Sequence, residues 1–183
     1  MIKKWIFLSA VAFLSLIGCT AHIVQFSSYA PVDLNAKIAV IPFANYTETP
    51  LAGERAMSIT AAEMESRGIP HLVVYQNQFQ GKVLFPGMNK IQSQKTLMHW
   101  ARSTHARYVM TGSVNEWSYK VGLDGEPVVG LTMQLIDVSS NRIVWTAVAS
   151  QSGGSRVAVS TVAQQVINSM LDGLSSYKQN HVT

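Results

Sequence analysis

The run KIAVIPF, Lys37–Phe43, is the segment that most restricts how this chain can fold. It is apolar from Ile38 to Ile41 and rich in β-branched residues, so it lacks the alternation of a strand with one solvated face. Such a strand needs cover on both faces, which parallel sheets packed by helices provide. Pro42 near its end cannot donate a backbone hydrogen bond, which ends or restricts the pairing there. The run therefore predicts an α/β fold.

The rest of the chain alternates helical and extended patterns in a way that fits this class. Leu51–Arg67 contains good helix formers and no proline, and Gly68 suits its C-terminal end. Ser93 is the expected N-cap of a helix that ends near His105. The other predicted elements are strands at 72–75, 108–119, 130–138 and 143–150, and a last helix over about 156–177. We expect one α/β domain whose mixed β-sheet is packed by helices in a three-layer-like sandwich.

Two further expectations concern single segments. In the strand at 130–138, Leu131, Met133 and Leu135 alternate with polar residues, so these three side chains should share one face. Gln76–Lys90 contains glycine, proline and amide residues and is predicted to be a loop that is long for a compact domain.

The N-terminus has the pattern of a bacterial lipoprotein signal peptide. Lys3 and Lys4 precede an apolar run of about a dozen residues, which is too short for a membrane span but long enough for a signal-peptide core. The run ends in LIGC, where Cys19 is the only cysteine of the chain and the expected site of acylation by diacylglycerol and palmitate. Thr20 stands where an aspartate retains many lipoproteins in the inner membrane, so we expect the outer membrane. An ordinary secretory signal with an incidental cysteine is the alternative.

These features divide the chain into parts. The expected boundaries are a signal peptide at 1–18, a lipidated tether at 19–36, an α/β domain at 37–177 and a C-terminal tail at 178–183. The tether prediction rests on the polar, non-periodic sequence of Ala21–Ala36. Removal of Lys3 and Lys4 with the signal peptide lowers the formal net charge from +4 to +2. The remaining basic residues are scattered, so we expect no nucleic-acid partner.

The sequence contains no recognisable catalytic motif. It has no G-x-S-x-G elbow, no P-loop and no GxGxxG. His99 and His105 are six residues apart, which places them on opposite faces of a helix, where they do not chelate one metal together. One cysteine excludes a disulfide framework and a thiolate zinc site. We therefore expect a non-enzymatic protein without a metal or a cofactor.

The segment GLDGEP holds two acids, Asp124 and Glu126, between two predicted strands. One interpretation is a polar hairpin connection in which Gly122 and Gly125 adopt positive φ. The other is functional, because the same two carboxylates repeated around a ring of identical chains would form a negatively charged belt.

Three aromatic residues on the predicted strands also have two interpretations. Trp117, Tyr119 and Trp145 are either core or sheet-surface residues, or contacts with a partner or a membrane, since Trp and Tyr favour interfaces.

The stretches KIAVIPFANYTETPLAGERA and TGSVNEWSYKVGLDGEPVVG resemble the PelC family of outer-membrane lipoproteins of the Pel exopolysaccharide export system. The resemblance covers roughly Lys37–Leu174. The opening IAVIPF is less specific, because it also resembles lipoprotein activators of peptidoglycan synthases and the curli secretion lipoprotein. One departure stands out: Gly153 and Gly154 occupy the place where the resemblance implies a bulky aromatic in a membrane-facing loop.

The resemblance implies a dodecameric ring on the periplasmic face of the outer membrane. Its partners would be a β-barrel porin with a tetratricopeptide scaffold, like PelB, and a cationic, partly deacetylated amino-sugar polymer. On this interpretation Asp124 and Glu126 line an acidic lumen. The alternative is a monomeric periplasmic lipoprotein that binds and activates a peptidoglycan synthase.

Overall fold

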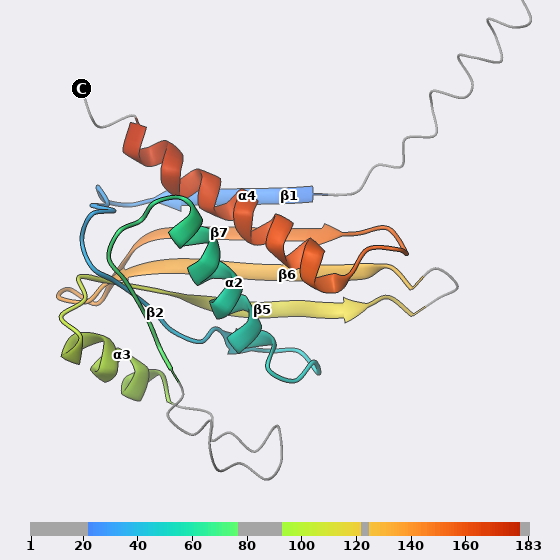
Figure 1. The fold of residues 1–183 in the computed structure, drawn as a ribbon, viewed down its shortest axis with the longest axis horizontal. Helices are drawn as coiled ribbons and strands as arrows, with labels where there is room; N and C mark the ends of the chain where they lie inside the picture. Colours follow the sequence, from blue (N-terminus) through green and yellow to red (C-terminus); the bar gives the residue numbers. More distant parts are fainter. Residues whose placement is uncertain (1–21, 77–92, 122–124, 180–183) are drawn as a thin grey trace, which may run out of the picture.

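The computed structural model describes residues 22–76, 93–121 and 125–179, and Figure 1 shows their arrangement. Within these ranges seven strands form one mixed sheet and three helices pack on it. The elements in chain order are β1 (His22–Ser28), β2 (Ile38–Val40), β3 (Ala44–Asn45), α2 (Ala52–Ser66), β4 (Leu72–Val74), α3 (Gln94–Ser103), β5 (Tyr108–Tyr119), β6 (Pro127–Asp137), β7 (Arg142–Ser152) and α4 (Val159–Gln179). Most of the predicted loop Gln76–Lys90 lies outside the described residues.

The sheet confirms the predicted mixture of parallel and antiparallel pairing. Its strand order is β1-β7-β6-β5-β2-β4, and β3 pairs with β5 outside this path. β2 is parallel to β4 and β5, whereas β5, β6, β7 and β1 are antiparallel neighbours. Helical crossovers connect parallel strands and short turns connect antiparallel ones, so both patterns follow from the connections visible in the sequence.

The predicted tether is wrong throughout its described residues, because His22–Ser28 forms the edge strand β1 along β7 and Leu34 is buried in the main core. Val24 packs against the core from this strand, while Gln25 points to solvent. Phe26 covers the helix α4 at Gly173, where an added Cβ would lie 2.6 Å from the phenyl ring. An edge strand has only one strand neighbour, so a short alternating segment can form it. Such a segment lacks the long apolar run by which a central strand is recognised in a sequence. The folded domain therefore includes His22–Ser28.

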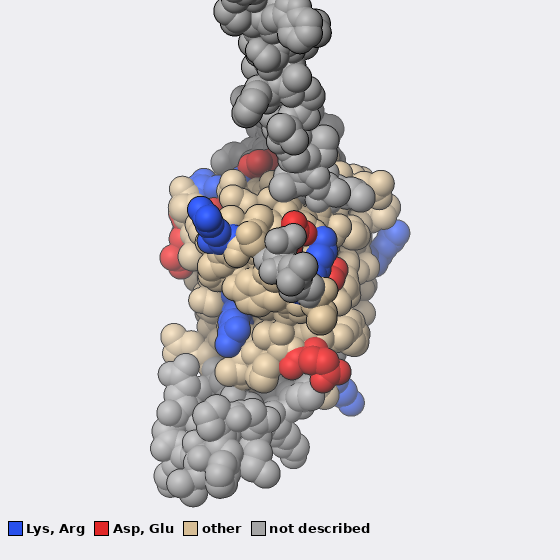
Figure 2. Space-filling view, turned by 90° about the vertical axis from the view of Figure 1, so that its right-hand side faces the viewer, with Lys and Arg blue, Asp and Glu red and all other residues tan. Residues whose placement is uncertain are grey.

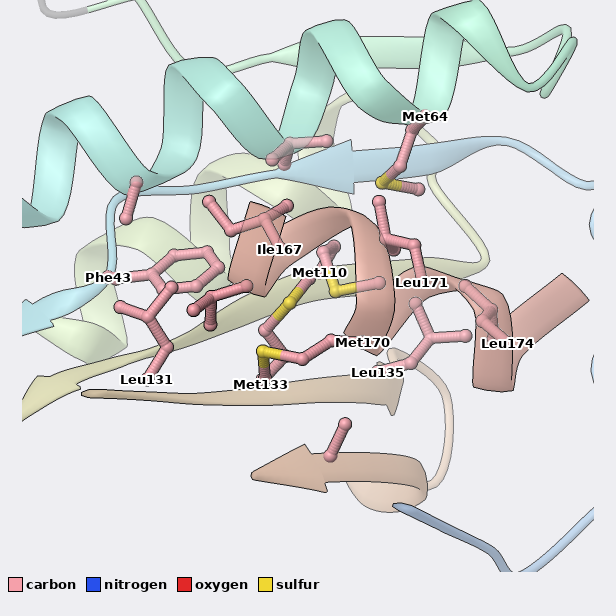
Figure 3. Packing of buried hydrophobic residues seen from close by; sticks show 14 of the residues in the cluster. Phe43, Met64, Met110, Leu131, Met133, Leu135, Ile167, Met170, Leu171 and Leu174 are labelled. Carbon is pink, nitrogen blue, oxygen red and sulfur yellow. The ribbon is translucent and has the colours of Figure 1, made fainter. Parts of the chain in front are cut away.

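Helices α2 and α4 cover one face of the sheet, and the main core lies between these helices and the sheet (Figure 3). As predicted, Leu131, Met133 and Leu135 of β6 share this face and are almost fully buried. Helix α2 buries mainly small residues against the sheet (Ala52, Gly53, Ala56, Thr60 and Ala61, with Met64). Small side chains let its backbone come close, so that Gly53 lies directly against the carbonyl of Phe43.

Among the described residues, the opposite face is covered only in part, by α3. Its Leu97, Met98 and Ala101 are buried in a second cluster with residues of β2, β5 and β6. Ser93 is the helix N-cap, as predicted, because its Oγ accepts a hydrogen bond from the Thr96 N–H at 3.3 Å. The third layer of the predicted sandwich therefore exists, and in the described part of the chain it is a single helix.

The turn between β6 and β7 is organised by Asp137. Its Oδ1 accepts hydrogen bonds from the backbone N–H groups of Ser139 and Ser140, at 3.0 and 2.9 Å, and from their hydroxyls. The side-chain hydrogen bond from Ser139, followed by the backbone bond from Ser140, lowers the pKa of Asp137 from 3.8 to about 2. These bonds favour the ionised carboxylate.

Asp137→Asn should therefore destabilise the domain by ~1 kcal/mol or less at pH 7, because the carboxylate is near solvent and partly screened. A carboxyl group whose pKa is lowered by folding stabilises the protein above the pKa of the unfolded chain. That stability disappears as the pH falls from about 4 towards 2, where Asp137 becomes protonated. Urea unfolding of both proteins across this range measures the difference, and an unchanged difference would contradict the role of the charge.

Candidate functional site

The hairpin between β5 and β6 carries the two acids of the sequence prediction, and the described part shows one of them. The Lys120 N–H donates to the Glu126 carbonyl at 2.8 Å, which closes the stem. The Lys120 Nζ lies 3.3 Å from Glu126 Oε2, with side chains 52% and 43% exposed. Gly125 has φ +50, as the turn interpretation requires. Asp124 lies outside the described residues.

Lys120 is a functional candidate that the sequence prediction missed. An exposed ion pair of this kind contributes about 0–1 kcal/mol, so a competing cation can displace the lysine from Glu126. When no such cation is present, the positive charge of Lys120 balances the negative charge of Glu126. The signal was present in the sequence, since a lysine directly after one predicted strand and a glutamate before the next can meet across a hairpin.

The hairpin lies at the same end of the sheet as the start of β1 (Figure 1). The pairing registers show this, because His22 is opposite Gln151, which is opposite Val129, which is opposite Trp117. Cys19 itself is outside the described residues, but it precedes His22 by three positions. Three extended residues reach at most about 11 Å. The expected acylation site is therefore held close to the end of the sheet that bears the hairpin.

Two of the three aromatic candidates are core residues. Trp117 is 2% exposed and Trp145 is 0% exposed, and the Nε1–H of each has no hydrogen-bond partner in the described structure. Neither side chain is available on the surface of the protomer, so their interpretation as interface or membrane contacts is wrong for the single chain. Tyr119 is 52% exposed, and its hydroxyl accepts a hydrogen bond from the Val159 N–H at 3.2 Å, at the start of α4. Alternation along a strand does not reveal which face a helix will cover.

The described residues contain no group of three or more His, Cys, Asp and Glu side chains that could hold a metal ion. None of the helices in the described ranges is long and apolar enough to cross a membrane. The histidines singled out in the sequence are both exposed, and His105 has a positive φ of 57 just after α3.

Comparison with known proteins places this fold in a class of envelope lipoproteins. A family model described as the peptidoglycan-synthase activator LpoB matches residues 38–150, which contain most of the sheet, with α2 and α3. A PelC dodecamer from Paraburkholderia phytofirmans is 39% identical, covering 84% of this chain and 97% of its own, with a TM-score of 0.70. A variant of the same PelC dodecamer is 40% identical, covering 82% and 96%, with a TM-score of 0.69. The chain belongs to the PelC family, whose core is shared with the LpoB-like class.

A more distant structure shows only that the fold is shared. Lipoprotein GNA1162 from Neisseria meningitidis is 14% identical, covering 77% of this chain and 99% of its own, with a TM-score of 0.54. No curated protein matches the chain.

Proposed function

We propose that this chain is a non-enzymatic outer-membrane lipoprotein of Pel exopolysaccharide export, acylated at Cys19 and assembled into a periplasmic ring. The observation that carries the proposal is the 39–40% identity to PelC dodecamers over more than 80% of the chain. The ring, most simply a dodecamer as in these relatives, would guide a cationic amino-sugar polymer to a β-barrel porin of the PelB type. No bond is made or broken in this function.

The position of the hairpin supports such a role. Because the hairpin lies at the end of the sheet nearest Cys19, its acids would surround the opening next to the outer membrane in a ring of such chains. Exposed charges are screened beyond about 8 Å at physiological salt, so attraction acts only on a polymer already inside the opening. Weak and repeated contacts also let the polymer leave.

Because of the ion pair, the two acids should contribute unequally to the negative charge of the hairpin. Lys120 balances Glu126 at 3.3 Å, so the three charged residues of the hairpin segment leave one net negative charge per chain. Asp124 should therefore contribute more than Glu126 to the charge that an approaching polycation meets. Repetition around the ring turns this single charge into a continuous negative potential.

Charge reversal of both acids, Asp124→Lys with Glu126→Lys, should lower polymer secretion roughly tenfold, the effect of ~1.4 kcal/mol of lost attraction. The variant should fold and reach the outer membrane normally, because the hairpin tip contributes little to the core. Glu65→Lys, an exposed position at the C-terminal end of α2, is the matched control and should secrete normally. Secreted polymer is measured in cells with equal amounts of each variant, and unchanged secretion by the double variant would refute the lumen assignment.

The match to the LpoB model favours one second candidate, a lipoprotein that activates a peptidoglycan synthase. Such a regulator would act as a single domain through a surface patch. Particle mass separates the two functions, because the export protein should behave as a ring in detergent and the regulator as one chain of under 20.0 kDa after signal-peptide removal. A particle that stays monomeric, also with its porin, would refute the export ring.

A further inference from the structure

The short distance between Cys19 and the folded domain restricts how the domain can sit on a membrane. Only Thr20 and Ala21 separate the cysteine from β1, so the acylated residue lies within about 11 Å of His22. β1 is fixed to β7 by continuous pairing from His22 to Ser28, so the domain does not swing freely on this anchor. The end of the sheet at which β1 begins must therefore face the bilayer that holds the acyl chains.

That end exposes apolar side chains. Val121 in the hairpin is fully exposed, and Tyr119 at the end of β5 is 52% exposed. Tyr46 is 74% exposed and lies on the loop after β3, which its backbone bond to the Val114 carbonyl attaches to β5. Tyrosine favours the boundary between water and lipid, since its ring is apolar and its hydroxyl is polar.

The charges at this end oppose contact with a membrane only weakly. Figure 2 looks onto it and shows mostly uncharged surface with scattered charges of both signs. Lys120 is paired with Glu126, and Arg156, beyond β7, is exposed and can meet an anionic headgroup. Asp124 leaves one net negative charge on the hairpin, and its repulsion of anionic headgroups is screened beyond about 8 Å at physiological salt, so the apolar contacts and the anchor decide the position of this end.

At Gly153 and Gly154, the connection from β7 to α4 offers no bulky side chain for contact with lipid. Gly153 is buried, and an added Cβ would lie 2.6 Å from Val162 and 3.0 Å from Pro127, so no larger side chain fits there. Gly154 has no side chain to insert. This chain therefore lacks an aromatic at the place where the family resemblance led us to expect one.

We infer that Tyr46, Tyr119 and Val121 lie in the headgroup layer of the outer membrane, with the strands of the sheet directed away from it. The inference rests on the acylation of Cys19 in the proposed function, but not on the ring or on the polymer. It also places the ion pair of Lys120 and Glu126, at the base of the hairpin, near the membrane surface.

Site-specific labelling of the acylated protein tests this contact. Because acylation blocks Cys19, the only native cysteine, Val121→Cys and Tyr46→Cys each provide one reactive thiol for an environment-sensitive fluorophore. Ile143→Cys is the matched control, since Ile143 is 41% exposed and lies beside the β6–β7 turn at the opposite end of the sheet. The labelled proteins are bound to vesicles of phosphatidylethanolamine and phosphatidylglycerol that contain lipids with a quencher on the acyl chain.

The labels at 121 and 46 should be quenched roughly threefold more than the label at 143, as expected for groups at the headgroup boundary. Insertion of a Gly-Ser spacer of about twelve residues before His22, with a reach of about 20 Å, should reduce this difference while the protein still floats with the vesicles. Equal quenching at all positions, or stronger quenching at 143, would overturn the inference. Failure of the unmodified protein to float would instead refute the acylated anchor of the proposed function, and the inference with it.

Discussion

Replacing Cys19 with alanine should release the protein from the outer membrane and abolish polymer secretion. Each buried methylene of an acyl chain contributes about 0.8 kcal/mol, so loss of the acyl chains removes most of the membrane affinity. The helices of the described residues offer no membrane span in compensation. Contact through three exposed side chains is too small to hold the domain without the anchor. Membrane fractionation and secreted polymer measure the two effects.

Two substitutions at Thr20 distinguish attachment of the protein to a membrane from its location in the outer membrane. Thr20→Ser should leave acylation, outer-membrane location and secretion unchanged. Thr20→Asp should remain acylated but stay in the inner membrane, so secretion should fall although the protein is still membrane-bound. A Cys19→Ala protein that remained with the outer membrane would show that the anchor is elsewhere.

Replacing Gly112 with alanine should destabilise the domain by about 3 kcal/mol or more, the upper range for overpacking a core. An added Cβ would overlap the carbonyl oxygen of Thr132 and lie 3.0 Å from the ring of Phe43. The carbonyl belongs to the neighbouring strand β6 and cannot move without breaking the pairing of β5 and β6. Low soluble yield and a lower urea midpoint are the expected results.

Gly154→Ala is the matched control, because nothing lies within 4 Å of its added Cβ. It should change the free energy of unfolding by no more than about 0.5 kcal/mol, like most surface substitutions. Equal stability of the Gly112 and Gly154 variants would contradict the close approach of β5 and β6.

Elements with strong local signals could be predicted from the sequence. The strand Tyr108–Tyr119 was predicted with the bounds that the structure shows, and α2 lies within the predicted Leu51–Arg67. Gly68 ends α2 with φ +73, as its position suggested. In each case the periodicity or the capping residue acts within one segment, so no knowledge of distant neighbours is needed.

The last helix and the first strand show where local signals fail. α4 begins at Val159 rather than near Arg156, because the preceding residues turn before the helix starts. The edge strand β1 was interpreted as part of a tether, because its own sequence carries no strong strand signal. It is stabilised by pairing with β7, which lies more than a hundred residues away in the chain. Pairing with a distant strand leaves little trace in a short edge segment.

The connection between β5 and β6 was predicted from the sequence, but its ion pair was not. The sequence placed Asp124 and Glu126 in a hairpin, and the structure adds that Lys120 pairs with Glu126. The burial of Trp117 and Trp145 depends on the helices packed over the sheet, which alternation along a strand does not specify. The contribution of Asp124 to a lumen stays a prediction.

The sequence by itself determined the order of the main elements and the α/β class, because these depend on residues close together in the chain. The export signal with Cys19 stays a prediction from the sequence. Only the tertiary structure decided that β1 joins the sheet and that the β5–β6 hairpin lies at the end where β1 begins. Burial and position depend on which surfaces meet, and those surfaces come from segments far apart in the chain.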